Sequence, residues 1–501
     1  MGDAGKAAPL RVGVVGAGPA GLCLAGALAR EGGRGENVEV VVFERRAPGG
    51  DQGSGWDIDA SGRAALERAG LDVASVQRAG SDTHRLFKVG RERPDYVLHD
   101  PPLMRMLRLH GQADLETDRT RIIDGLLAAL EDCPGAEVRF GAGAIDVVPC
   151  LPPAGPGGRG GAAVLGENGS VLGEFDVVID ASGSVSRLRG RRFAAGSAAS
   201  YTGVSWIQGV VDSPEASLAP EIVRLLGEGT LMLAGPTRGG KGTLYAGLQR
   251  FGAVAEDRRA KFTIHPSELD TADPYSLARE LGLSREVRGL VTERKAVKRV
   301  RAAMLEELSE WPDDYRAIAD AISGFRVLPL FMHPSDTETE RLPEDGLPLL
   351  CIGDALHALP PWSGTSGNFA LRDASDAATA LLRLARAGAH LLPSPVSKPA
   401  LPVKEHGEEG PIENPDIGVV PTLRILEASF LARADGDGWD RVRDRCRKVG
   451  RAMSEDWQIT PLESFDFIDF LTGGEKSMAS TCIAWSFRFL TWLNSWDNFR
   501  M

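Results

Sequence analysis

The sequence predicts an α/β fold in which a discontinuous domain built on a parallel sheet carries an inserted β-sheet domain, with a helical segment at the C-terminus. Three observations support this prediction. A strand, a glycine-rich turn and a helix follow one another near the N-terminus. A second strand–loop–helix segment lies at residues 350–381, and residues 200–250 alternate short β-rich runs with turns. The 501 residues are enough for two or three domains.

The composition narrows the class of protein. Hydrophobic residues make up 43% and charged residues 25%, as in ordinary globular proteins, and the formal net charge of −12 argues against a nucleic-acid partner. The six cysteines form no CxxC pair, which argues against a disulfide framework and against a metal site. The sequence has no apolar run long enough for a membrane span and no signal-peptide core. We therefore expect a cytoplasmic enzyme acting on a small molecule.

The first fifty residues contain a strand–turn–helix–strand pattern. Leu10–Val15 is an apolar run with three valines, typical of a buried parallel strand. The turn Gly16-Ala17-Gly18-Pro19-Ala20-Gly21 follows, and residues 22–30 are strong helix formers. A second apolar strand at residues 38–43 ends at Glu44. This order predicts a dinucleotide-binding site.

Each position in that turn has a physical role. Gly16 permits the tight turn, Gly18 lets a pyrophosphate approach the backbone, and Gly21 lets the helix pack closely on the strand. Ala20 lies in the same turn, at the helix start that faces the phosphates. Glu44 can accept hydrogen bonds from ribose hydroxyls. The pattern by itself does not distinguish NAD from FAD.

A second motif follows a predicted strand that ends at Gly353 and Asp354. A loop of Pro, Gly and Ser comes next, and a helix begins at about Asn368. The carboxylate of Asp354 is well placed to bind a cofactor hydroxyl. The loop from Gly364 to Gly367 offers backbone N–H groups at a helix start, which suit an electron-rich carbonyl or a phosphate.

The run Gly-Asp-Ala-Leu-His, followed by two prolines, a glycine and an asparagine, resembles the FAD-dependent aromatic hydroxylases of the para-hydroxybenzoate hydroxylase type. The resemblance implies a Rossmann-like FAD-binding domain. It implies that Asp354 binds the ribityl chain of the flavin and that the isoalloxazine ring lies against Gly364, Gly367 and Asn368. Many family members have Gly-x-Gly-x-Asn where this chain has Gly-Thr-Ser-Gly-Asn.

Two further segments carry the same resemblance. A helix predicted from Arg119, with spaced leucines, matches a family helix that begins with an arginine on the flavin side; Arg121 is a nearby alternative. Residues 175–189 resemble an Ala-Asp-Gly-x-x-Ser-x-x-Arg segment tied to FAD and the nicotinamide donor, with Ser182 in place of the aspartate. With one dinucleotide motif present, Arg45 is the candidate for the donor phosphate.

The middle of the chain most resembles the tetracycline-inactivating flavin monooxygenases. In those enzymes the matching sheet holds substrate with a Gln, an Arg and a His. Here Gln208 retains the first, Thr230 takes the Arg position and Tyr245 the His position. Met232 and Pro361 are further candidate substrate contacts. The loss of two charge-assisted partners predicts a less anionic, more apolar ligand.

The resemblance implies a monooxygenase that uses FAD, transient NAD(P)H and O2 to hydroxylate or epoxidise an aromatic or polycyclic small molecule in secondary metabolism. In this family a flavin C4a-hydroperoxide transfers the oxygen, so no catalytic side chain is expected. Two alternatives stay open: a flavin-binding redox or sensor protein and a Baeyer–Villiger oxygenase. A halogenase is disfavoured because no Trp-x-Trp-x-Ile-Pro segment occurs. The sequence is compatible with a monomer or a dimer.

The domain boundaries follow from these motifs. We expect the FAD-binding domain at residues 10–80, 100–195 and 325–385 and the substrate domain at 196–324. Residues 386–420 are interpreted as a linker or exposed excursion, and residues 421–501 as a C-terminal helical region that includes a helix at 440–457 and an aromatic stripe at 485–496.

Local patterns add three expectations. Residues 137–148 and 162–178 are predicted to form hairpin strands. Residues 267–308 are expected to be mainly helical. Residues 235–241 match a phosphate-binding GxxxxGK motif, but Gly242 replaces its Ser/Thr and a strand pattern follows, so a hairpin turn is predicted instead.

Overall fold

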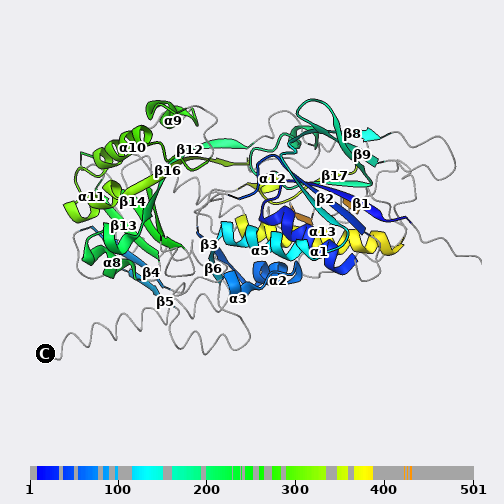
Figure 1. Cartoon of the computed structure of the whole chain (residues 1–501), viewed down its shortest axis with the longest axis horizontal. Helices are drawn as coiled ribbons and strands as arrows, with labels where there is room; N and C mark the ends of the chain where they lie inside the picture. The colour runs from blue at the N-terminus through cyan, green and yellow to red at the C-terminus, as the bar shows by residue number, and fades with distance from the viewer. Residues whose placement is uncertain are drawn as a thin grey trace, which may run out of the picture.

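The structure is a computed structural model. It describes residues 8–32, 38–49, 55–76, 83–89, 96–99, 115–150, 161–192, 199–227, 230–236, 238–239, 243–251, 259–264, 273–283, 289–333, 347–358 and 366–387, together with residues 422, 423, 426, 429 and 430. Two lobes are visible, each built around its own sheet (Figure 1).

The first lobe contains a five-stranded parallel sheet in the order β17-β11-β1-β2-β7. Its strands are β1 (Leu10–Val15), β2 (Val38–Glu44), β7 (Ala136–Phe140), β11 (Val177–Asp180) and β17 (Leu349–Cys351). Valines and other apolar residues dominate these strands because both faces of the sheet are covered.

Helices and a second small sheet cover the two faces of this parallel sheet. Helix α1 (Pro19–Gly32) packs against α5 (Arg119–Glu131) and α13 (Ser366–Ala387) on one face (Figure 1). A three-stranded antiparallel sheet packs on the other face, where its apolar side chains join Val15, Phe43 and Val178 in one core. The carboxyl ends of β1, β2 and β11 thus lie at one edge of a layered domain.

The prediction of two hairpin strands at residues 137–148 and 162–178 is wrong at the outer ends of both segments. Strand β7 at the start of the first and β11 at the end of the second are parallel members of the main sheet. Only the parts between them, β8 (Ala144–Cys150), β9 (Gly161–Gly166) and β10 (Val171–Phe175), pair antiparallel. A glycine at positive φ, Gly141, ends β7 and redirects the chain.

The second lobe contains a seven-stranded sheet in the order β16-β12-β15-β14-β13-β4-β5. Its strands are β4 (Thr83–Lys88), β5 (Tyr96–His99), β12 (Ser200–Asp212), β13 (Thr230–Pro236), β14 (Thr243–Phe251), β15 (Arg259–Ile264) and β16 (Ile322–Met332). Strands β13 and β14 form the hairpin predicted in place of a phosphate-binding loop, with Pro236 opposite Thr243. This inserted sheet confirms the predicted fold class.

Five helices accompany the seven-stranded sheet: α7 (Pro214–Ser217), α8 (Pro220–Leu226), α9 (Ser276–Glu280), α10 (Arg294–Glu307) and α11 (Asp313–Asp320). Apolar side chains of α8, α9, α10 and α11 share one core with alternate residues of the strands. Strand β16 begins at Ile322 and pairs along β12, so residues 325–332, assigned from the sequence to the first domain, are paired in the second sheet. Strands β4 and β5, which had no predicted role, complete its far edge.

A two-stranded antiparallel ribbon lies between the lobes (Figure 1). It consists of β3 (Gly55–Ile58) and β6 (Leu115–Asp118). The short helices α2 (Ala60–Arg68) and α3 (Val73–Val76) follow β3, and α6 (Arg189–Arg192) and α12 (Asp354–His357) complete the first lobe. The ribbon runs directly into α5, because β6 ends where that helix begins.

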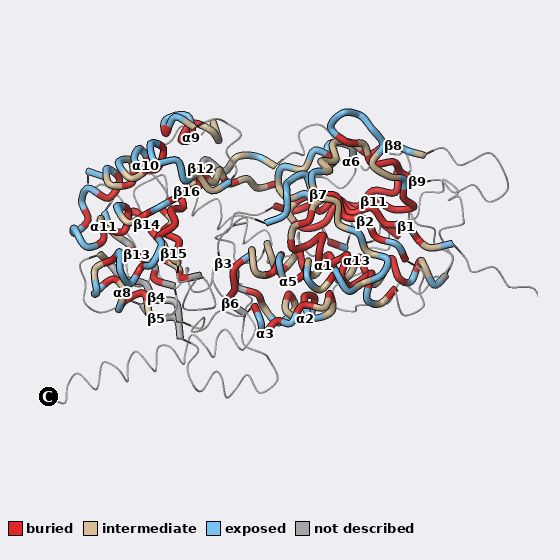
Figure 2. Tube along the Cα trace, in the orientation of Figure 1, coloured by how far each residue is buried: buried red, intermediate tan, exposed pale blue. Residues whose placement is uncertain are grey.

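Burial is concentrated in the two sheets and the helix faces against them (Figure 2). Leu423, Leu426 and Phe430 pack into the core of the first lobe, so part of the predicted C-terminal region contributes to that domain. The predicted linker, the helix at 440–457 and the aromatic stripe lie outside the described residues. None of the helices within the described ranges is long and apolar enough to cross a membrane.

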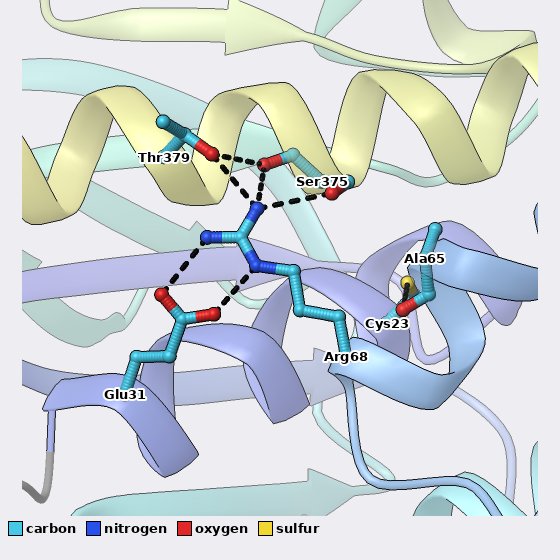
Figure 3. A network of polar contacts seen from close by, with 6 residues as sticks. All are labelled: Cys23, Glu31, Ala65, Arg68, Ser375 and Thr379. Atoms are coloured by element: carbon cyan, nitrogen blue, oxygen red, sulfur yellow. Dashed lines mark hydrogen bonds and ion pairs between the residues drawn. The ribbon is translucent and has the colours of Figure 1, made fainter. Parts of the chain in front are cut away.

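One arginine joins three helices of the first lobe (Figure 3). Arg68 at the end of α2 donates to both carboxylate oxygens of Glu31 on α1, at 2.6 and 3.0 Å. It also donates to the carbonyl oxygen of Ser375 at 2.6 Å and to the hydroxyl of Thr379 at 2.8 Å, both on α13. The side chain is 23% exposed, so water screens these bonds only in part.

Replacing Arg68 by methionine is expected to lower the free energy of unfolding by about 2 kcal/mol, because charged hydrogen bonds to two other helices are lost. Arg63→Met on the same helix is the matched control: Arg63 forms one i,i+4 pair with Glu67, worth about 0.2–0.5 kcal/mol. Urea unfolding of both variants measures the difference. Equal losses would show that Arg68 does not join the helices energetically.

Candidate functional site

The glycine turn between β1 and α1 is packed tightly onto the end of β11. Gly16 has φ +106°, and an added Cβ would lie 2.6 Å from the carbonyl oxygen of Ala181. At Gly21 an added Cβ would lie 2.0 Å from the Gly16 carbonyl oxygen. Gly18 is different: an added Cβ there would have one described neighbour within 4 Å, Nη2 of Arg119 at 3.6 Å. The turn is therefore tightly packed at Gly16 and Gly21 but open at Gly18. Beside Gly18, Ala20 and the first turn of α1 present N–H groups without intrahelical acceptors.

Glu44 lies at the end of β2, where the sequence placed it. One carboxylate oxygen accepts a hydrogen bond from the backbone N–H of Ala17 at 3.1 Å, and the other accepts from that of Arg46 at 3.0 Å. Its side chain is 12% exposed, so the carboxylate is fixed beside the glycine turn and still reachable. Arg45, the candidate for the donor phosphate, is exposed on the same rim.

A cavity opens at this edge of the parallel sheet. Its lining includes Gly16, Glu44, Arg45, Ser182 and Arg187. The first three belong to the N-terminal motif, and the last two belong to the segment at residues 175–189, which we call the third motif. The cavity thus lies at the carboxyl ends of adjacent parallel strands, the usual place for a ligand in such a sheet.

The third motif is organised by a buried carboxylate that sequence reasoning did not single out. Asp180 ends β11 and is fully buried, and burial raises its pKa. It accepts hydrogen bonds from the backbone N–H and the hydroxyl of Ser182, at 3.0 and 2.6 Å, and from the hydroxyl of Ser186. Ser182, which replaces the family aspartate, therefore holds the loop against Asp180.

Arg189 connects the third motif to the second. Its side chain donates to the carbonyl oxygens of Ala355 and Leu356, at 2.8 and 2.7 Å. These carbonyls belong to the short helix α12, which begins with Asp354. Arg189 thereby fixes α12, which carries Asp354, relative to the third motif.

Asp354 and Arg119 lie close to each other, although 235 positions separate them in the sequence. Arg119 keeps accessible surface, yet burial is the main influence on its pKa and lowers it, while the Asp354 carboxylate most strongly opposes this shift. Asp354 accepts a hydrogen bond from the hydroxyl of Ser366 at the start of α13. The alternative, Arg121, donates instead to the carbonyl oxygen of Val76 at 3.4 Å.

The start of α13 packs against the ribbon and α2. An added Cβ at Gly367 would lie 1.8 Å from Cζ2 of Trp56, so the indole lies directly on this glycine. The side-chain oxygen of Asn368, a buried residue, accepts a hydrogen bond from the backbone N–H of Asp59 at 3.1 Å. Gly364 and Pro361 lie outside the described residues.

Two buried histidines support the second motif. The Nε2 atom of His357 lies 2.5 Å from a carboxylate oxygen of Asp373, which also accepts from the Gly353 N–H at 3.0 Å. Burial opposes the charged form of His357, but Asp373 outweighs this and raises the histidine's pKa. His333 has its pKa lowered to about 2, chiefly by burial, and its Nδ1 accepts from the Ala358 N–H at 2.7 Å. Asp373 and His333 carried no sequence signal because their partners are distant in the chain.

The seven-stranded sheet positions the predicted substrate residues. Gln208 is buried and donates to the hydroxyl of Thr263 on the neighbouring strand, at 3.3 Å. The structure describes Thr230, Met232 and Tyr245 by backbone register only, opposite Gln249, Gly247 and Ala234. Gly247 pairs with Thr263 on its other side, and no described atom lies within 4 Å of a Cβ built there. Among the described residues, none fills the space over this part of the sheet.

The residues present fit an FAD molecule. The glycine turn leaves an open approach above Gly18 beside the N–H groups of α1, as a pyrophosphate requires. Glu44 and Asp354 supply carboxylates for hydroxyl groups at two places, and Arg119 supplies a cation between the motifs. Smaller nucleotides would leave the second motif without a ligand.

Two family models match parts of the chain: an FAD binding domain over residues 334–402 and an NAD(P)-binding Rossmann-like domain over residues 14–57. Among solved structures, the chain is similar to 2,6-dihydroxypyridine-3-hydroxylase from Arthrobacter nicotinovorans, with a TM-score of 0.62 and 15% identity over 91% of this chain and 95% of that one. It is also similar to a salicylate hydroxylase substrate complex, with a TM-score of 0.58 and 17% identity over 93% of each chain.

A third similar structure is CtdE in complex with FAD and a substrate, with a TM-score of 0.58 and 15% identity over 95% of this chain and 100% of that one. No curated protein matches the sequence. The matched segment is that of an FAD binding domain, and the chain shares its fold with these hydroxylase and CtdE structures. The predicted resemblance and the predicted cofactor FAD are thereby confirmed.

Proposed function

We propose that the chain is an FAD-dependent monooxygenase that uses NAD(P)H and O2 to hydroxylate or epoxidise an aromatic or polycyclic small molecule, a substrate class typical of secondary metabolism. One observation carries the proposal. Gly18, Arg119 and Asp354 come from three separate segments and lie together in the first lobe, while the inserted sheet carries a buried polar residue, Gln208. When bound, FAD supplies the redox chemistry and the activation of O2.

The protein's own residues then bind, orient and exclude water. The first turn of α1 and Glu44 would hold the adenosine part of FAD, while Asp354 and Arg119 would hold the part nearer the flavin. Arg45, which is exposed on the rim, is our candidate for contacting the donor phosphate of NAD(P)H. Gln208, held by Thr263, is placed to orient a substrate hydroxyl or carbonyl.

Substrate-stimulated NAD(P)H oxidation by the FAD-loaded protein tests this function. A panel of aromatic and polycyclic compounds is screened, and product mass and structure are determined for each compound that stimulates oxidation. Incorporation of one oxygen as a hydroxyl or epoxide supports the proposal. An ester from a ketone would indicate a Baeyer–Villiger oxygenase, and flavin reduction without any stimulating compound would favour a redox or sensor protein.

Gln208→Ala is expected to raise peroxide formation per NAD(P)H oxidised by about fivefold on the true substrate, because one orienting hydrogen bond of about 1 kcal/mol is lost. Tyr245→Phe is expected to act in the same direction. The flavin-to-protein ratio of both variants is the internal control and is expected to stay at the wild-type value. Wild-type coupling in both variants would place the substrate elsewhere. Tetracycline is expected to be a poor substrate, and efficient turnover would refute the specificity argument.

Gly247→Val is expected to abolish substrate-stimulated oxidation while FAD remains bound, because the added side chain enters the open space beside Thr263. Gly247→Ala adds only one methyl group and is expected to give an intermediate loss. Substrate affinity is read from the change in flavin absorbance on titration. Two variants with wild-type affinity would show that the space over Gly247 is not part of the substrate site.

A further inference from the structure

The ribbon between the lobes is held at one end by two neighbouring residues of the seven-stranded sheet. Within the ribbon, Gly55 of β3 lies opposite Asp118 of β6. Within the sheet, Gln249 of β14 lies opposite Lys261 of β15. The Gly55–Asp118 pair of the ribbon thus lies against the Gln249–Lys261 pair of the seven-stranded sheet.

Both contacts are direct. The backbone N–H of Gly55 donates to Oε1 of Gln249 at 3.0 Å, and an added Cβ at Gly55 would lie 1.9 Å from Nε2 of Gln249. The Lys261 ammonium donates to Oδ2 of Asp118 at 2.7 Å, and the two side chains are 2% and 5% exposed. An ion pair with so little exposure is a poor source of net stability because both charges are desolvated. Its geometry, however, is tightly defined.

The end of the ribbon that Lys261 and Gln249 hold contacts two elements of the candidate flavin site. The second oxygen of Asp118 caps α5 by accepting from the Thr120 N–H at 2.8 Å, and Arg119 is the first residue of that helix. Trp56, next to Gly55, lies on Gly367 at the start of α13. A displacement of the ribbon end would therefore move both Arg119, the cation beside Gly18, and the packing at the start of α13.

We propose that Lys261 and Gln249 clamp the ribbon, and that Lys261 is a positioning residue which sets Arg119 for cofactor binding from the substrate-bearing sheet. The inference rests on the proposed function in one respect, that the ligand beside Arg119 is FAD. The clamp links the two lobes energetically, so ordering of the ribbon and binding of FAD favour each other.

The main test is Lys261→Met, with Arg250→Met as the matched control. Arg250 is adjacent to Gln249 in β14 and is 8% exposed, but its partner Glu215, 39% exposed and 2.5 Å away, is in α7, within the second lobe. Two measurements are made: the dissociation constant of FAD for the flavin-free protein, and hydrogen–deuterium exchange of peptides covering residues 55–58 and 115–120.

Lys261→Met is expected to weaken FAD binding at least tenfold and to speed exchange at residues 115–120, whereas Arg250→Met stays within twofold of the wild type for FAD. If Lys261→Met fails to fold, the double variant Lys261→Met, Asp118→Asn removes both buried charges and keeps the helix cap. It is expected to fold, with the same fast exchange and weak FAD binding. Lys261→Arg, which keeps the charge, is expected to recover part of the affinity.

The clamp is refuted if the charge-free double variant keeps wild-type exchange and FAD affinity, or if Arg250→Met weakens FAD binding as much as Lys261→Met does. A wild-type protein that binds no FAD would instead refute the proposed function. In that case the exchange rates still decide whether Lys261 orders the ribbon and the start of α5.

Discussion

Gly16→Ala is expected to give a protein that retains no FAD. The residue has φ +106°, where a side chain costs about 1–2 kcal/mol of backbone strain. In addition, its Cβ would lie 2.6 Å from the carbonyl oxygen of Ala181, a backbone atom that cannot move without shifting β11 against β1. The glycine turn must therefore open, and the N–H groups of α1 no longer point toward the position of the pyrophosphate. The flavin-to-protein absorbance ratio after purification measures the loss.

Gly190→Ala is the matched control for that experiment. Gly190 lies in the short helix α6 at a negative φ, and no described atom lies within 4 Å of an added Cβ. Alanine there is expected to leave FAD content unchanged and to be neutral or slightly stabilising. A Gly16→Ala protein with full flavin content would contradict the placement of the pyrophosphate at this turn.

Asp354→Ala is expected to weaken FAD binding by about 10- to 100-fold, because the loss of a partly buried charged acceptor costs about 1–3 kcal/mol. Asp354→Asn keeps an acceptor for Ser366 and is expected to fall between the wild type and the alanine variant. Titration of flavin-free protein with FAD, followed by flavin fluorescence, gives the three dissociation constants.

Asp313→Ala controls for the general loss of a carboxylate. Asp313 is on α11 in the second lobe, with its side chain 96% exposed, and its removal is expected to leave FAD affinity unchanged. If Asp354→Ala bound FAD as tightly as Asp313→Ala, the second motif would have no part in holding the cofactor. The function proposed for the chain would then lose one of its three converging residues.

The sequence predicted the parts of this protein whose signals are local. The strand, turn and helix at residues 10–32 are specified by a run of valines, three glycines and an Ala/Leu-rich segment, all within reach of one another along the chain. The start of α5 at Arg119 and the strand end before Asp354 follow equally local patterns. Backbone conformation and hydrophobic periodicity are properties of short segments, so a single sequence is enough to read them.

Strand partners could not be read in the same way. Residues 136–140 and 177–180 have the composition of hairpin strands, and they join the parallel sheet because β2 and β1 offer them a buried edge. The decision between Arg119 and Arg121 is similar: both are arginines in the first turn of one helix. Helical geometry directs one toward Asp354 and the other toward Val76.

The sequence alone therefore predicted the fold class and the cofactor, and it identified the motifs that we propose to hold FAD. Only the tertiary structure decided how separate segments meet: Asp180 with the serine that replaces the family aspartate, His357 with Asp373, and Lys261 with Asp118. Each of these contacts joins polar groups buried by the fold, and a buried polar group must find its partner wherever the chain brings one. That partner is set by packing across the molecule, which local sequence patterns do not record.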